Sequence, residues 1–234
     1  MVSAQIWSII FLSLQVAVFA LLWAVPLAFG LAYLLARKQF VGRQLLSAII
    51  MLPLVMPPVV TGLVLLYLFG PLGPIGLLLA PLGISFAFNS AGASLAAGLV
   101  ALPLIVRPIR LSLEAVDPNL EEALAVAGKT SWQRFKMLYL PMSLPGIIAG
   151  GILGFAKALG EFGATITFVA NIPGETQTFS LAIHAALQRF DGQQTVLMLS
   201  LVSISISVVA VLCSEYLLNW LQNRMMGERV VRHA

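Results

Sequence analysis

Long uncharged stretches dominate the pattern of apolar and polar positions along this chain. The first charged side chain is Arg37, and no charge occurs from Gln44 to Val106. Two further uncharged stretches cover residues 137–156 and 192–214. Roughly 20 apolar residues in helical conformation are enough to cross the hydrocarbon core of a bilayer. The pattern therefore predicts a protein that is embedded in a membrane.

The same pattern predicts an all-α, polytopic transmembrane bundle with about five spans. We place the spans at about 8–36, 45–69, 90–112, 142–168 and 194–219. The first is read as a retained span, because its N-terminus lacks the basic segment of a signal peptide. After the second span, GPLGPIGLLLAPLG is predicted to be a loop with a shallow re-entrant turn. Residues 1–234 are treated as one transmembrane domain.

Composition and the placement of charges predict how the chain is oriented in the membrane. The chain is 60% hydrophobic and 9% charged, with a mean hydropathy of +1.00, whereas soluble domains carry about 25% charged residues. Eleven of the 13 Lys and Arg lie in segments that this topology puts on one side, leaving Lys157 in a span and Arg189 opposite. Because basic loops stay in the cytoplasm, we expect the N-terminus outside and the C-terminus inside. This topology also explains the net charge of +4, and no nucleic-acid partner is expected.

The one polar loop of any size, at about 114–138, contains a loose match to a phosphate-binding loop. Residues 123–130 read ALAVAGKT, with Ala in place of the first Gly of that motif. A phosphate-binding loop follows a strand and ends at the start of a helix, where backbone amides converge on the phosphate. The sequence contains no pattern typical of a parallel sheet, so a nucleotide site is not expected here.

Helix-capping residues give the same loop a different interpretation. Asp117 followed by Pro118 is typical of a helix start, and Gly128 is typical of the position after a helix end. Thr130 and Gln133 have the spacing of a capping box, which begins a second helix. The loop is therefore predicted to be a cytoplasmic helix–turn–helix.

The first of these two helices has a narrow apolar stripe. Its members recur at i, i+3, i+4 and i+7, with Glu121 and Glu122 beside them: Leu120, Ala123, Leu124 and Ala127. Such a helix could insert into a groove of a soluble partner. It could equally be a solvated connector that lies against the protein's own cytoplasmic face. The residues alone leave both alternatives open.

The fourth predicted span carries two stripes of residues at helical spacing. Gly146, Gly150, Gly154 and Ala158 recur every four residues, which favours close packing against another helix. The second stripe consists of Lys157, Glu161 and Thr165. Charges inside a span are costly and face a cavity or a partner, so this stripe either lines or gates a pathway, or is a neutralised pair that holds the bundle together.

The second predicted span contains prolines that should bend it. Pro57 and Pro58 follow Pro53, and Thr61 could offer a hydroxyl nearby. Interrupted helices often mark a translocation path, and a simple packing kink is the alternative. Catalytic or metal chemistry is not expected, because His184, His233 and Cys213 are dispersed. An enzyme that uses the pair of Lys157 and Glu161, or a stand-alone channel, is a rival interpretation.

The polar loop resembles a motif of a known protein family. Glu122-Ala123-Leu124, then Gly128, then Leu138-Tyr139-Leu140-Pro141 is similar to the EAA loop of bacterial ABC importer permeases, which reads E-A-A, three residues, G, nine residues, I-x-L-P. Leu124 replaces the second Ala and Leu138 replaces Ile. In that family the loop forms a coupling helix that docks on the ATP-hydrolysing subunit. The resemblance thus implies a docking role for Leu120, Glu121, Glu122, Ala123, Leu124, Ala127, Gly128, Leu140 and Pro141.

Two other stretches resemble the molybdate permease subunits within this family: LPLVMPPVVTG (52–62) and LGEFGATITFVANIPGETQT (159–178). The resemblance implies a type I ABC importer permease fold in a bacterial inner membrane, with molybdate as cargo and tungstate as a second candidate. It also implies a homodimer, two ATPase subunits and an extracytoplasmic molybdate-binding protein. Sulfate and thiosulfate importer permeases share the general plan and are the alternative.

Overall fold

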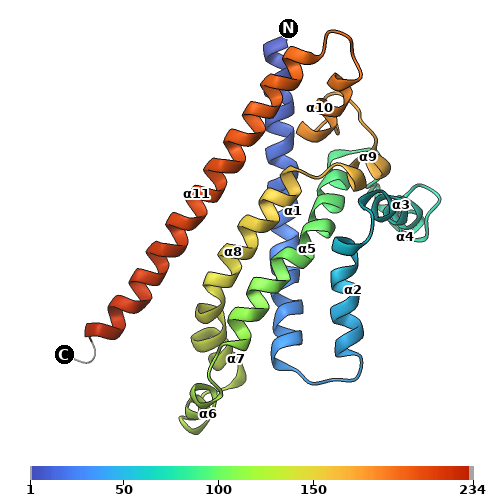
Figure 1. The fold of residues 1–234 in the computed structure, drawn as a ribbon. Coiled ribbons are helices and arrows are strands. Elements are labelled where there is room, and N and C mark those ends of the chain that lie inside the picture. The colour runs from blue at the N-terminus through green and yellow to red at the C-terminus, as the bar shows by residue number, and fades with distance from the viewer. Residues whose placement is uncertain (1, 232–234) are drawn as a thin grey trace.

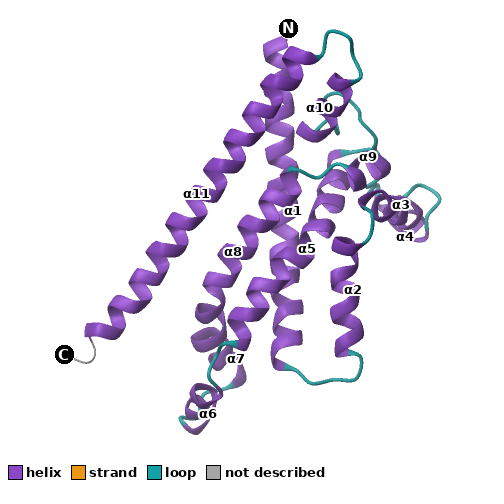
Figure 2. Ribbon diagram, in the orientation of Figure 1, coloured by secondary structure: helices purple, strands orange, loops and turns teal. Residues whose placement is uncertain are grey.

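The structure, a computed structural model, describes the backbone of residues 2–231 and the side chains of residues 6–213 and 216. Over that part of the chain every regular element is a helix, and no strand occurs (Figure 2). Four helical segments are long and apolar enough to cross a membrane: Ile6–Arg37, Ser90–Glu114, Ser131–Leu159 and Gln193–Cys213. A bent pair of helices makes five if it is counted as one span. The predicted all-α bundle of about five spans is confirmed.

The spans are α1 (Val2–Arg37), α5 (Ser90–Glu114), α8 (Leu140–Leu159) and α11 (Gln193–Val231). Helices α1, α5 and α8 lie side by side, and α11 diverges from them toward its C-terminal end (Figure 1). Shorter elements lie at both ends of the bundle and, for α3 (Pro58–Phe69), α4 (Pro74–Leu79) and α9 (Gly163–Val169), at one side of it. At one end lie α6 (Pro118–Val126) and α7 (Ser131–Arg134), which a π-helical turn (Phe135–Tyr139) connects to α8. At the other end lie the N-terminus and α10 (Phe179–Leu187).

Helix α5 forms the centre of the bundle and packs against both α1 and α8. The glycine stripe of α8 allows its backbone to approach α5 closely. A Cβ atom added to Gly146 would lie 2.5 Å from the carbonyl oxygen of Pro108, and one added to Gly150 would lie 2.8 Å from that of Ile105. The predicted packing role of this stripe is therefore confirmed, because any side chain larger than hydrogen would force the two helices apart.

The second predicted span, 45–69, is not one continuous helix. It consists of α2 (Arg43–Val55) and α3 (Pro58–Phe69), and the helix direction bends by 114° at the break between them. Met56 between them has extended backbone, with φ −69° and ψ 147°. Pro57 and Pro58 cause the break, because proline lacks the backbone N–H that the helix needs and disfavours helical backbone in the residue before it. The Gly/Pro-rich loop that follows contains α4 (Pro74–Leu79) and a single 3₁₀ turn (Ala80–Leu82).

The fourth predicted span, 142–168, is also wrong in its boundaries. The helical segment begins at Ser131, includes α7, the π-helical turn and α8, and ends at Leu159. A separate short helix, α9 (Gly163–Val169), follows after three residues. Lys157 and Thr165 therefore lie on different helices, and the predicted continuous stripe of Lys157, Glu161 and Thr165 does not exist. An apolar sequence is compatible with both arrangements, since hydropathy does not report where a helix is interrupted.

Candidate functional site

Helix α6 starts where the capping residues predict. The Asp117 side chain accepts a hydrogen bond of 2.9 Å from the amide of Asn119, and Pro118 occupies the first helical position. These contacts satisfy one free amide and remove another at the start of the helix. A helix of only nine residues is marginal in isolation, so this start fixes where it forms.

The end of α6 and the start of α7 are equally well defined. Gly128 has a φ of +74°, the amide of Lys129 donates to the carbonyl of Leu124, and the amide of Gly128 donates to that of Ala125, each at 3.0 Å. This is the Schellman pattern that closes a helix with a left-handed residue. Thr130 and Gln133 then cap each other reciprocally. The helix–turn–helix is confirmed, and the Gly-Lys-Thr stretch follows a helix rather than a strand.

The predicted apolar stripe of α6 divides between two directions. Leu124 is half-buried and packs against the apolar cluster at this end of the bundle. The remaining stripe residues, together with Glu122 and Val126, are exposed, and Val126 is 90% exposed. One face of α6 thus lies on the protein, as the connector alternative requires. The other offers an exposed apolar surface at the end of the bundle, as the docking alternative requires.

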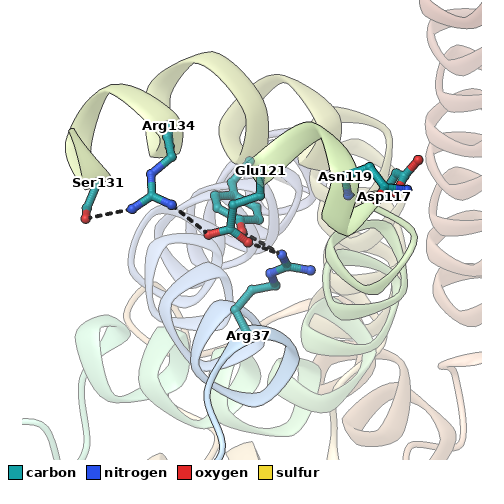
Figure 3. A network of polar contacts seen from close by, with 7 residues as sticks. Arg37, Asp117, Asn119, Glu121, Ser131 and Arg134 are labelled. Carbon is teal, nitrogen blue, oxygen red and sulfur yellow. Dashed lines mark hydrogen bonds and ion pairs between the residues drawn. The ribbon is translucent and has the colours of Figure 1, made fainter. Parts of the chain in front are cut away.

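A polar network fixes the inward face of α6 (Figure 3). Arg37, the last residue of α1, donates from Nη2 to Glu121 Oε2 and, at 2.7 Å, to the hydroxyl of Tyr139. Its guanidinium carbon lies 4.8 Å from the centre of the Tyr139 ring. Arg134 of α7 forms an ion pair of 3.5 Å with the other Glu121 oxygen. One carboxylate therefore joins α1, α6 and the segment that leads into α8.

The protonation of Glu121 follows from these contacts. The hydrogen bond from the Tyr139 hydroxyl, followed by the hydrogen bond and positive charge of Arg37, lowers the pKa of Glu121 below its ordinary value of 4.5. Partial burial acts in the opposite direction but does not outweigh them. Glu121 is therefore a carboxylate at neutral pH, with both oxygens engaged.

The sequence did not predict the roles of Arg37, Tyr139 and Arg134 in this network. Arg37 counted only as a topological charge, and Tyr139 occupies the variable position of the I-x-L-P pattern. Arg37 and Glu121 are 84 positions apart, and no local spacing reports such a contact. Of the two motif residues that follow, Leu140 is 40% exposed and Pro141 is half-buried.

The second group of candidate residues gathers where two helices are interrupted. The break between α2 and α3 lies beside the break between α8 and α9: a Cβ added to Gly163 would lie 2.7 Å from Cβ of Pro58. One turn further along α3, a Cβ added to Gly62 would lie 2.5 Å from the carbonyl oxygen of Ala164. Thus α3 and α9 pack backbone against backbone.

Three polar candidates at these breaks are buried. Glu161 is 3% exposed and forms an ion pair of 3.1 Å with Lys157, and its other oxygen accepts the amide of Ala164 at 3.0 Å. Thr165 is 1% exposed. The hydroxyl of Thr61 is buried without a hydrogen-bond partner among the described residues. Pro57 and Pro58, in contrast, are exposed.

Comparison with known sequences places these features in context. Residues 24–227 match a family described as "Binding-protein-dependent transport system inner membrane component". The chain is 50% identical over 219 residues to the molybdenum transport system permease protein ModB of Haemophilus influenzae, covering 93% of this chain and 94% of that protein. The ModB protein of Escherichia coli K12 is 46% identical over 212 residues, with 90% and 93% covered. The sulfate transport system permease protein CysT of E. coli K12 is 38% identical over 207 residues, with 88% and 73% covered.

Solved structures are similar in fold at low sequence identity. A bacterial ABC transporter involved in the import of alginate matches with a TM-score of 0.70 and 18% identity, covering 94% of this chain and 79% of that chain. The MetNI methionine ABC transporter in an inward-facing conformation matches with a TM-score of 0.66 and 14% identity, covering 94% and 95%. The predicted type I ABC importer permease fold is confirmed.

Proposed function

Because this chain belongs to the family of binding-protein-dependent transport system inner membrane components, we propose that it carries molybdate into the cytoplasm as the permease subunit of an ATP-driven importer. One observation carries the choice of cargo. The chain is 50% identical, over 93% of its length, to a protein named for molybdenum transport. Identity to a sulfate permease is lower, at 38%, and that relative is covered only to 73%. Tungstate is the second candidate cargo.

The chain is a transport subunit and not an enzyme, so energy must come from a partner. We propose that two ATPase subunits dock on the 114–138 loop of a homodimer of this chain. The exposed side of α6 supports this proposal, because Leu120 is 48% and Val126 90% exposed on a helix that projects from the end of the bundle. A short amphipathic helix of this kind suits a groove on a soluble partner. The same contact would include Glu122, Ala123, Ala127 and Gly128. Support for α6 from the side of the bundle would come from Leu124, Leu140 and Pro141.

The same proposal fixes the orientation in the inner membrane. The end of the bundle that carries α6 also carries Arg37, Lys38 and Arg43, and it would face the cytoplasm by the positive-inside tendency. The N-terminus and α10 would then face outward, where an extracytoplasmic molybdate-binding protein delivers the anion. The C-terminus would be cytoplasmic.

We further propose that the paired helix breaks lie on the translocation pathway. Discontinuous helices supply polar backbone groups inside a membrane only where they line a cavity or are buried in protein. The candidates for lining or gating this pathway lie at both breaks. They are Pro57, Pro58 and Thr61 at the break between α2 and α3, and Lys157, Glu161 and Thr165 at the break between α8 and α9. The partly exposed Lys157 supports this, since a charge in a span does not face lipid without cost.

Reconstitution tests the function directly. The chain, its ATPase subunit and the cognate binding protein are placed in proteoliposomes, and uptake of molybdate, tungstate and sulfate is measured with and without ATP. We expect ATP-dependent uptake of molybdate, with sulfate excluded at equal concentration. Preferred uptake of sulfate would overturn the cargo, and uptake without the ATPase subunit would overturn the importer mechanism.

A further inference from the structure

The side chain of Glu121 provides the main directional contact between α6 and the rest of the bundle. None of the nine side chains of α6, all of which the structure describes, is fully buried. Leu124 provides apolar packing, which is not directional. The contact of Glu121 with Arg37 is a charge-assisted hydrogen bond, and Arg37 is only 16% exposed. Such bonds are stronger and geometrically more specific than exposed ion pairs.

The guanidinium of Arg37 is held in place by its own surroundings. It bonds to the Tyr139 hydroxyl and lies over the Tyr139 ring, and Tyr139 is 2% exposed. The position of Glu121, and hence the direction in which the exposed face of α6 points, therefore depends on where the end of α1 lies.

The opposite part of α1 makes a second buried polar contact. The hydroxyl of Ser13 accepts a hydrogen bond of 2.8 Å from the amide of Phe179, the first residue of α10. Ser13 is 2% and Phe179 1% exposed. Ser13 also donates to the carbonyl of Ile9 at 2.7 Å, which orients its oxygen toward α10.

Both contacts belong to one uninterrupted helix. Helix α1 runs from Val2 to Arg37 and continues through Pro26. Ser13 and Arg37 are separated by 24 residues, or about 36 Å along a helix axis. A displacement of either end of such a helix is carried to the other, because the helix resists compression along its axis and is packed against α5 over its length.

We propose that α1 connects the outward helix α10 to the docking helix α6, with Arg37 as the positioning residue at the docking end and Ser13 at the outward end. This inference rests on the proposed function, because it takes α6 as the surface on which the ATPase subunit docks. Events at the outward face then alter the orientation of α6 without any contact between α6 and α10.

The chain offers a matched control for each end. Arg110 forms an ion pair of 2.7 Å with Glu114 of its own helix, so Arg110→Gln removes an arginine–glutamate contact that does not involve α6. Ser205 donates to the carbonyl of Leu201 at 2.7 Å, the same local bond that Ser13 makes, but within α11. Ser205→Ala therefore removes that local bond without the link between α1 and α10.

The experiment measures the affinity of the ATPase subunit for the reconstituted permease, and the stimulation of ATPase activity by the molybdate-loaded binding protein. Arg37→Gln should weaken ATPase docking roughly tenfold or more, the effect of losing a charge-assisted hydrogen bond. Arg37→Lys should retain part of the docking, because it keeps the charge but not the planar fork. An Arg37→Gln complex that docks like Arg110→Gln would overturn the proposal.

A double-mutant cycle then tests the link itself. Ser13→Ala should lower the stimulation by the binding protein when Arg37 is present and have little further effect in Arg37→Gln, whereas sites this far apart are ordinarily additive. Ser13→Thr, which keeps the hydroxyl, should restore the stimulation, and this separates the link from misfolding. Equal effects of Ser13→Ala in both backgrounds would overturn the proposal. If the wild-type complex itself shows no ATPase docking, the proposed function fails instead.

Discussion

Lys157, in the last turn of α8, forms an ion pair of 3.1 Å with Glu161, which lies in the interruption between α8 and α9. Glu161 uses its second oxygen to accept the amide of Ala164, so both oxygens of this buried acid are occupied. The pair therefore does more than neutralise two charges in the membrane. It holds the end of one helix against the start of the next, at the place where α9 meets α3.

Replacement of Glu161 by Ala should strongly destabilise the protein. It would leave the Ala164 amide without an acceptor and Lys157 unpaired. Breaking a fully buried pair costs about 3–5 kcal/mol, and the partial exposure of Lys157 should reduce the loss to the lower end of that range or below it. Glu161→Gln keeps an oxygen for Ala164 and should cost less. Thermal unfolding in detergent measures both, with the exposed Glu175→Gln as the control. Equal unfolding temperatures for the Ala and Gln variants would contradict the capping role.

Gly62→Ala should separate α3 from α9. The added Cβ would lie 2.5 Å from a backbone oxygen, so the two helices must shift, and overpacking of this kind costs about 1–3 kcal/mol. Gly151→Ala is the control, because nothing lies within 4 Å of an added Cβ there, and the change should stabilise α8 by up to about 1 kcal/mol. Chemical denaturation of the two purified variants gives the comparison, and destabilisation by both would refute the close packing.

Substitutions on the exposed face of α6, or at the turn that ends it, should stop transport without preventing insertion into the membrane. Ala123→Arg adds bulk and charge to the proposed docking surface, and Gly128→Pro forbids the left-handed backbone that ends the helix, where φ is +74°. Molybdate uptake should be lost while the amount of protein in the membrane stays normal. Val41→Arg, at a fully exposed position at the same end of the bundle, should transport normally. Normal uptake by Ala123→Arg would refute the docking surface.

The contact of Arg37 with Glu121 should depend on pH in one direction. The pKa of Glu121 is lower in the folded protein than its ordinary value of 4.5, mainly through Tyr139 and Arg37. The stabilisation is therefore fully present above that value and is lost as the pH falls through the lowered pKa. The difference in unfolding temperature between wild type and Glu121→Gln should be constant near neutral pH and shrink below about pH 4.5. A difference that grows on acidification would contradict this sign.

The sequence allowed prediction of those features that are encoded locally. Asp117, Gly128 and Thr130 determine the helix–turn–helix because each satisfies or terminates the backbone next to it. The charge asymmetry located the loop at one end of the bundle. In contrast, the interruptions after Val55 and Leu159 lie within apolar stretches, where both sides of the break look like membrane span.

The residues that hold the loop in place required the structure. Arg37 was visible only as a charge at the end of a span, since nothing near it in sequence indicates a partner in the 114–138 loop. The prolines at 57 and 58 indicated a bend, but not that the bend reaches 114° or that it lies beside the second break. Contacts between distant segments depend on the packing of whole helices, which periodicity does not specify.

The two polar contacts of α1 have a consequence for how the chain is made. Helix α1 is synthesised before both of its polar partners, which follow 84 residues after Arg37 and 166 residues after Ser13. At ribosomal speeds the second interval lasts on the order of ten seconds or more. Neither contact can form before Glu121 has been synthesised, and the contact of Ser13 must wait until Phe179 has been synthesised. Helix α1 thus completes its polar contacts only after α10 has been synthesised, although its packing partner α5 precedes α10 in the chain.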